Sequence, residues 1–380
     1  MQNPFETEER AAFREQVRRL VAAEITPNVD TWDEAGAVPR ALHEKIGALG
    51  AFGFGIEEQF GGLGFDDCFM RAAYGEEMAR CGSTGISAAV GGRTISTGPI
   101  QALANEDIKA RVLPDVVAGR KSSSLAITEP GGGSDVASLR TSAIKDGNHY
   151  VISGEKTFIT GGMIADYYVV GARTGGPGLK GISLFFVEAD STGLSRTAIE
   201  RKMGWWASDT ATLHFDEVRV PATNMLGDEN RGFLAIMNNF NYERLGMVAG
   251  MLGAMKCAFD TALDWARDRH TFGGPLIEKQ VIRHKFSDMS ARIDQIESYL
   301  WVLCHQANTG PMPVAEISKA KFSASKAMEF VCSEAMQILG GAGYLRGNPV
   351  ERLYREVKVQ AIGGGSEEIM RDLAARQMGL

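Results

Sequence analysis

The hydrophobic pattern changes twice along the chain, and these two changes restrict its fold more than any other feature. Over about residues 6–119, apolar residues recur at three- and four-residue spacing, as amphipathic helices require. Short runs of aromatic and branched residues replace them over about residues 122–226, and long helical periods return from Gly232. The sequence therefore predicts an α+β multidomain protein with the order helices, β unit, helices.

The runs of each kind can be placed more closely. The β-like runs, each bounded by turn residues, are His149–Ser153, Tyr167–Ala172, Ile182–Val187 and Thr212–Val220. Asp146-Gly147 stands where a hairpin turn would precede the first of these runs. The longest helical periods cover Phe233–Arg269, Val281–Asn308 and Val314–Leu339. Gly340 and Gly341 close the last period, at the usual position of a helix C-cap.

The length of the chain predicts several packed units. A chain of 380 residues exceeds what one compact core supports. Hydrophobic residues at 44% and charged residues at 23% give an ordinary globular balance and exclude a disordered chain. We expect an N-terminal helical domain over residues 1–120, a middle β-barrel-like domain over 121–228 and a C-terminal four-helix bundle over 229–380.

Charge and segment composition argue against two classes of partner. The net charge is −7 and the basic residues are scattered, whereas nucleic-acid binding needs a concentrated basic surface. The N-terminal segment MQNPFETEERAAFREQ lacks the basic and apolar parts of a secretory signal. No uncharged apolar run approaches the ~20 residues of a membrane helix. We therefore expect a soluble, cytoplasmic protein that binds neither nucleic acid nor membrane.

The familiar catalytic and metal signatures are absent from the sequence. There is no Walker A motif, no HExxH and no GxSxG, and the five cysteines lie far apart, as is typical of reduced, buried thiols. One GxGxxG match at residues 176–181 contains Pro177 and leads into a strand, so it indicates a loop and not a dinucleotide site. The six histidines lack metal-ligand spacing, and Cys304 and His305 point to different faces of a helix. We expect no metal.

One glycine-rich loop suggests a ligand site. Ile127–Asp135 follows the first β-like residues and contains three consecutive glycines. Consecutive glycines let backbone N–H groups approach a pyrophosphate or a ring edge closely. On composition alone a flexible turn is the commoner interpretation.

Five motifs, taken together, favour the ligand interpretation. They are Thr128–Asp135 (TEPGGGSD), Ser153–Gly162 (SGEKTFITGG), Arg269–Gly273 (RHTFG) with Gln280 seven residues further on, Gln337–Tyr344 (QILGGAGY) and Gly363–Ile369 (GGGSEEI). In these motifs, and in their order over nearly the whole length, the chain resembles the acyl-CoA dehydrogenase family.

The resemblance implies FAD as cofactor, extended between the β domain and the C-terminal helices. Residues that match cofactor contacts within one subunit are Leu125, Ile127, Thr128, Gly133, Ser134, Phe158, Ile159, Thr160, Ser366 and Glu368. Among them Thr160 matches a hydroxyl near flavin N5, and Phe158 takes the place of a tryptophan. Residues that match contacts to the FAD of a neighbouring subunit are Arg269, Phe272, Gln280, Gln337, Gly340 and Gly341. The resemblance thus implies a homo-oligomer, which in the family is usually a tetramer.

The resemblance also identifies a candidate catalytic base. Many family members carry a glutamate just before the glycine that matches Gly365, but this chain has Gly364 there, which cannot accept a proton. In the isovaleryl- and long-chain-type branches the glutamate projects from an earlier helix, and Glu243 matches that site. Without the resemblance, a solvated helix charge would be the commoner interpretation. Substrate contacts are expected at Ser134, Asn241, Arg244, Gly364 and Gly365.

The implied function is α,β-dehydrogenation of an acyl-CoA to a trans-2-enoyl-CoA, with electrons passed to an electron-transferring flavoprotein. Because Gly363–Gly365 stand where bulkier residues are common in the family, we expect long or branched acyl groups. Two alternatives remain open. One is an acyl-CoA oxidase that uses oxygen, although such oxidases are typically longer. The other is a catalytically silent protein that binds flavin or acyl-CoA.

Overall fold

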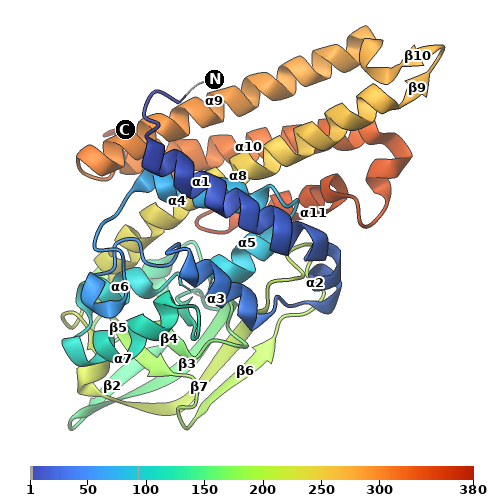
Figure 1. Cartoon of the computed structure of the whole chain (residues 1–380). Coiled ribbons are helices and arrows are strands. Elements are labelled where there is room, and N and C mark those ends of the chain that lie inside the picture. The colour runs from blue at the N-terminus through green and yellow to red at the C-terminus, as the bar shows by residue number, and fades with distance from the viewer. Residues whose placement is uncertain (1–2, 93) are drawn as a thin grey trace.

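The computed structural model describes residues 3–92 and 94–380 and has the predicted order of helices, sheet and helices (Figure 1). The N-terminal helices are α1 (Glu8–Leu20), α2 (Val29–Ala35), α3 (Arg40–Ala48), α4 (Cys68–Ala79), α5 (Thr84–Gly91), α6 (Thr97–Leu103) and α7 (Glu106–Val117). In α1 the side chain of Thr7 caps the first turn, and Phe13 and Val17 are buried against the rest of the unit. This amphipathic pattern explains why the segment is helical.

The middle of the chain forms one mixed sheet. Its strands are β1 (Ser123–Ala126), β2 (Ser142–Asp146), β3 (His149–Thr160), β4 (Tyr167–Arg173), β5 (Ile182–Glu188), β6 (Leu194–Ala198), β7 (Thr210–Pro221) and β8 (Met225–Leu226). The strand order is β6-β7-β3-β2-β4-β5-β8, and β1 pairs in parallel with β4. Asp146-Gly147 turns β2 into β3 as predicted, with Gly147 at φ +63°.

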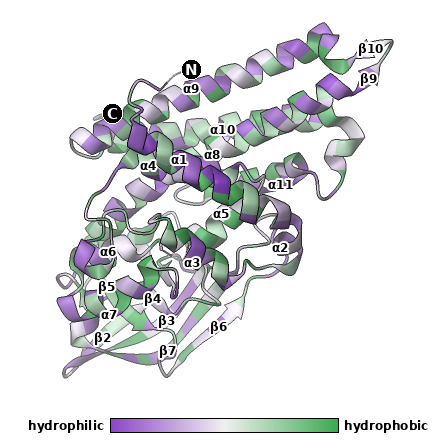
Figure 2. Ribbon diagram, in the orientation of Figure 1, coloured by the Kyte–Doolittle hydropathy of each residue, from purple (hydrophilic) through white to green (hydrophobic). Residues whose placement is uncertain are grey.

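Both faces of the central strands are covered. Alternate residues Val169 and Phe186 pack with residues of α6, α7 and α8, whereas Tyr168 and Phe185 belong to a second apolar cluster within the β unit. This explains why β4 and β5 read as continuous apolar runs, without the polar alternation of a half-exposed strand. Figure 2 shows the contrast with the long helices, along which polar and apolar residues are mixed.

The C-terminal helices form the bundle in the upper part of Figure 1. They are α8 (Gly232–Asp268), α9 (Gln280–Thr309), α10 (Val314–Leu339), α11 (Pro349–Ile362) and α12 (Glu367–Gln377). A short hairpin of β9 (His270–Thr271) and β10 (Gly274–Pro275) joins α8 to α9 at one end of the bundle. Small residues at every fourth position of α8, from Ala254 to Ala266, let the neighbouring helices approach closely.

Most of the predicted elements are confirmed. All four β-like runs lie in strands, the three helical periods lie in or close to α8, α9 and α10, and residues 176–181 form the loop before β5. Gly340 ends α10 at φ +60°. One expectation is wrong in part: Cys257 is half-buried, because it lies where α8 is only partly covered, while the other cysteines are buried. The domain boundaries at residues 120 and 228 stay predictions.

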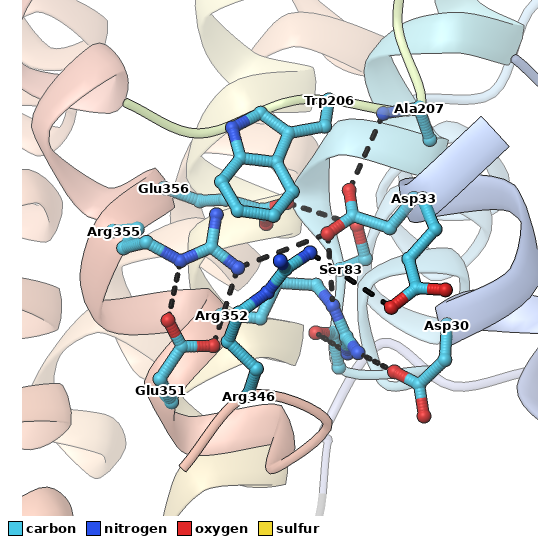
Figure 3. Close-up of polar contacts among 12 residues, drawn as sticks. Asp30, Asp33, Ser83, Trp206, Ala207, Arg346, Glu351, Arg352, Arg355 and Glu356 are labelled. Carbon is cyan, nitrogen blue, oxygen red and sulfur yellow. Dashed lines mark hydrogen bonds and ion pairs between the residues drawn. The ribbon is translucent and has the colours of Figure 1, made fainter. Parts of the chain in front are cut away.

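A partly buried polar cluster joins the helical units and the β unit, and we call it the junction cluster (Figure 3). It contains Asp30, Asp33, Ser83, Thr84, Trp206, Ala207, Arg346, Glu351, Arg352, Arg355 and Glu356. Asp33 of α2 accepts the Ala207 N–H at 3.3 Å and lies 3.6 Å from the Arg352 guanidinium of α11. These contacts connect segments that lie far apart in the sequence and hold the N-terminal half of α11 in place.

Candidate active site

The carboxyl group of Glu243 is the most unusual group on α8. Its Oε2 atom is inaccessible and has no hydrogen-bond partner among the described residues, although part of the side chain remains accessible. Burial raises the pKa of Glu243 to about 7, against the opposing effect of the positive charges of Arg244 and Lys321. A carboxyl group with an unpartnered buried oxygen and a pKa near neutrality has the properties of a general base.

A glycine loop between α11 and α12 lies beside Glu243. Arg244 donates from Nε to the Gly364 carbonyl at 2.9 Å and from Nη1 to Asn241 Oδ1 at 3.1 Å. Gly364 has φ +67°, and a Cβ atom there would lie 2.6 Å from the sulfur of Met247, one turn beyond Glu243 on α8. A side chain at position 364 would therefore strain the backbone and displace Met247, and the structure brings Asn241, Glu243, Arg244, Gly364 and Gly365 together.

The loop Ile127–Asp135 is anchored at its base. Glu129 accepts from the N–H groups of Arg140 and Thr141 at 2.6 and 2.8 Å and pairs with Lys156 at 2.8 Å. Burial alone would raise the pKa of Glu129, but the charge and hydrogen bonds of Lys156 hold it below its usual value. Burial lowers the pKa of Lys156 to about 8. The tip is exposed, and a Cβ at Gly131 or Gly132 would meet nothing within 4 Å. The stem of the loop is therefore held in place, whereas its glycine tip is open to solvent.

Phe158 lies on β3 next to this loop in an unusual conformation. Its φ is +57°, and 67% of it is exposed, although Thr157 and Ile159 on either side are buried. The pairing of β3 with β7 shifts register at this point, between Lys156 and Ile159. Thr157 N–H donates to the Thr128 carbonyl at 2.8 Å, which joins strand and loop. An exposed aromatic ring in a strained strand segment fits the face of a large planar ligand.

The remaining predicted residues of this region have simpler positions. Leu125 is half-buried in β1, Ile127 is buried against Ile236 of α8, and the Thr160 carbonyl accepts from Ser124 Oγ at 2.9 Å. Gly133 and Ser134 are exposed at the glycine tip. Because Ile236 lies seven residues before Glu243, α8 connects the loop region to the carboxyl group. The structure gives Ser134 no contact with the residues around Glu243.

Another set of predicted residues lies far from Glu243. Arg269, Phe272 and Gln280 lie at the β9–β10 hairpin, about 39 Å along α8 from Glu243 by helical rise, and Phe272 is fully exposed. Gln337, Gly340 and Gly341 are exposed at the end of α10. Ser366 and Glu368 lie elsewhere, just after Gly365: Ser366 caps α12 and Glu368 is exposed in its first turn. One chain therefore does not bring the hairpin residues to its own Glu243.

Comparison with known families decides the identification. Models of the N-terminal, middle and C-terminal domains of acyl-CoA dehydrogenase match residues 7–120, 124–218 and 230–379. This chain belongs to the acyl-CoA dehydrogenase family. A relative, cyclohexane-1-carbonyl-CoA dehydrogenase of Geobacter metallireducens, is 35% identical over 98% of each chain. The family assignment, the fold class and the expected oxidoreductase class are therefore confirmed.

Solved structures of this family have the same architecture. A probable acyl-CoA dehydrogenase from Mycobacterium abscessus superposes with a TM-score of 0.95 at 41% identity, over 98% of this chain and 99% of the other. A glutaryl-CoA dehydrogenase from Mycobacterium smegmatis, solved in complex with FADH2, superposes with a TM-score of 0.91 at 26% identity, over 98% and 95% of the two chains.

Within residues 3–92 and 94–380, no helix is long and apolar enough to cross a membrane. Nor does any group of His, Cys, Asp and Glu in the same ranges have the arrangement of a metal site.

Sequence reasoning missed two buried lysines of this acyl-CoA dehydrogenase. Lys156 anchors the glycine-rich loop, and Lys321 of α10 donates to the Gly365 carbonyl at 2.6 Å. A signal for Lys321 exists in the sequence: it shares the helical face of Ile317, Ala324 and Met328, all of which are buried. A lysine within an apolar stripe indicates a specific buried partner.

Proposed function

We propose that this chain is an FAD-dependent acyl-CoA dehydrogenase in which Glu243 is the catalytic base. One observation carries the proposal: a buried carboxyl oxygen without a hydrogen-bond partner lies beside a glycine loop whose carbonyls are held by cations. The α-proton of a thioester is a very weak acid, so its removal needs both a positioned base and stabilisation of the developing enolate oxygen. Glu243 takes the α-proton, and the peptide N–H of Gly364 donates to the thioester oxygen.

Bound FAD would supply the acceptor for the β-hydride. Leu125, Ile127, Thr128, Gly133, Ser134, Phe158, Ile159, Thr160, Ser366 and Glu368 are the residues proposed to hold it. The exposed, strained Phe158 ring and the open glycine tip support this assignment, because both fit a ligand with an aromatic ring and a pyrophosphate. The related structure with FADH2 adds support from the family.

We further propose that the active form is a homo-oligomer. The hairpin and the end of α10 expose Phe272, Tyr344 and Leu345, at 100, 83 and 64% of their surfaces. Exposed apolar groups at one end of a bundle are typical of a subunit interface. Arg269, Phe272, Gln280, Gln337, Gly340 and Gly341 would contact the FAD of a second copy there. A tetramer follows the habit of the family, and an electron-transferring flavoprotein would reoxidise the enzyme.

We propose long-chain or branched acyl-CoAs as substrates. Residues Gly363–Gly365 bring no side chains of their own to the loop, and the base projects from α8; both features favour this substrate class, with Met247 and Met370 packed against the loop. The relative from Geobacter metallireducens is a dehydrogenase of a cyclic acyl-CoA, which supports this direction.

The test is an anaerobic titration of the purified protein with short, long and branched acyl-CoAs, following the visible flavin band. Bleaching by long or branched thioesters, and weaker bleaching by butyryl-CoA, is the expected result. If butyryl-CoA were the best substrate, the proposed substrate class would be wrong. Bound flavin that no acyl-CoA bleaches would favour a silent binding protein, and rapid peroxide release in air would favour an oxidase.

A further inference from the structure

Lys321 occupies a position that its charge makes costly. It lies on α10, is fully buried, and donates from Nζ to the Gly365 carbonyl at 2.6 Å. Burial lowers its pKa to about 8, helped by the charge of Arg244 and opposed by Glu367, Glu243 and Glu368. Removing an ammonium group from water is expensive, so a lysine here needs a reason beyond filling space.

Tying α10 to the loop does not require a charge. One turn further along α10, Ser325 donates from its hydroxyl to Glu367 Oε1 at 2.9 Å, at the start of α12. This neutral hydroxyl joins α10 to the chain two residues beyond Gly365. The feature that distinguishes Lys321 is its charge, which acts on Glu243 and on the carbonyl that it binds.

Arg244 and Lys321 hold consecutive carbonyls from two different helices. Arg244 of α8 binds the Gly364 carbonyl at 2.9 Å, and Lys321 of α10 binds that of Gly365. Gly364 and Gly365 have φ values of +67° and +105°, in the left-handed region that glycine tolerates. Fixing both carbonyls fixes the peptide planes of a segment that glycine would otherwise leave free.

We propose that Lys321 is a positioning residue of the base site: together with Arg244 it fixes the Gly364–Gly365 peptides, and it places a buried positive charge at this loop. The inference rests on the proposed function, because it assumes that Glu243 is the base. The charged groups that act on Glu243 are Arg244 and Lys321, and Glu367 and Glu368 in turn act on Lys321.

The sign of the expected effect follows from these charges. Glu243 must be deprotonated to accept a proton, so the rate of flavin reduction falls as the pH drops below its pKa of about 7. Removing the positive charge at position 321 disfavours the carboxylate and raises the pKa of Glu243 further. The acid limb of the rate profile should therefore move to higher pH.

The test compares Lys321→Met and Lys321→Gln with the matched control Ser325→Ala. Lys321→Gln keeps a hydrogen-bond donor without the charge, and Ser325→Ala removes the neutral tie between α10 and the start of α12. Flavin reduction is measured across about pH 5.5 to 9, and the Glu243 carboxyl is titrated by infrared difference against Glu243→Gln in each background. Both lysine variants should raise the midpoint by about half a pH unit or more, while Ser325→Ala leaves it unchanged.

The outcomes separate the two proposals. If Lys321→Met and Lys321→Gln kept the wild-type midpoint and lost only thermal stability, as Ser325→Ala does, Lys321 would be a structural tie and the inference overturned. If the infrared midpoint moved but no acyl-CoA reduced the wild-type flavin, the coupling between Lys321 and Glu243 would stand and the proposed function would fail. If Lys321→Met does not fold, Lys321→Gln alone decides.

Discussion

Two glutamates in the helical bundle, Glu243 and Glu356, have the same burial-driven shift but opposite surroundings. Burial raises the pKa of each to about 7. Glu356, in the junction cluster of Figure 3, accepts hydrogen bonds from Ser83 Oγ at 3.0 Å and from the N–H and hydroxyl of Thr84 at 2.6 and 2.9 Å. Glu243 Oε2 accepts none among the described residues.

The difference shows why a raised pKa alone does not identify a catalytic base. The lone pairs of Glu356 are engaged by donors of the N-terminal helices, so its carboxyl group holds two units together. Glu243 Oε2 has no hydrogen-bond partner among the described residues and the residue is half-buried, so its carboxyl group is left for a substrate proton. The cost of leaving a buried oxygen unsatisfied is expected at a functional site and not in a structural network.

The largest effect that would test this comparison is on the reaction rate. Glu243→Gln keeps the shape of the side chain but removes its basicity, so the rate of flavin reduction by acyl-CoA should fall by about 10²–10⁴-fold. Glu356→Gln should stay within about tenfold of wild type, because its role is structural. Stopped-flow absorbance of the flavin band measures both. Near-normal reduction by Glu243→Gln would show that the base lies elsewhere.

For the free energy of unfolding we expect the opposite order: substitution of Glu356 should have the larger effect and substitution of Glu243 the smaller. Glu356→Ala leaves the buried donors of Ser83 and Thr84 without an acceptor and should lower the free energy of unfolding by about 2–4 kcal/mol. Glu243→Ala removes a desolvated group that satisfies no donor, so the free energy should change by less than about 1 kcal/mol. Urea denaturation at neutral pH measures both. Equal losses in the two variants would contradict the division into a reactive and a structural glutamate.

How much the sequence could predict depends on whether a feature is set by neighbouring residues or by distant ones. Helical and strand periods depend on neighbouring residues, so β3, α8 and α10 could be predicted, and Glu243 and Gly364 could be matched because each lies within a short motif. The partners of Lys156, Lys321 and Glu356 lie 27, 44 and 272 residues away along the chain. Local patterns do not specify which distant groups meet, so the loop Ile127–Asp135 could be predicted, but neither its contact with Lys156 nor the junction cluster could.

The smallest effects on stability and rate are expected from adding a methyl group at Gly364, where the surroundings of Glu243 are closely packed. Gly364 and Gly147 have similar backbones, at φ +67° and +63°, but a Cβ at Gly364 would lie 2.6 Å from the Met247 sulfur, whereas one at Gly147 would meet nothing within 4 Å. Gly147→Ala should therefore cost only the backbone strain, about 1 kcal/mol, and leave the rate unchanged. Gly364→Ala should cost about 1 kcal/mol more and slow flavin reduction, because Met247 must move beside Glu243.

A double-mutant cycle isolates the contact with Met247. Combining Gly364→Ala with Met247→Ala opens the space that the new methyl group needs, so the two changes should cost less together than the sum of their separate costs. Combining Gly147→Ala with Met247→Ala should be additive, because nothing lies within 4 Å of a Cβ at Gly147. Additivity in both cycles would mean that Met247 moves aside without cost, and that the loop at Gly364 is kept in place by its carbonyl contacts with Arg244 and Lys321 alone.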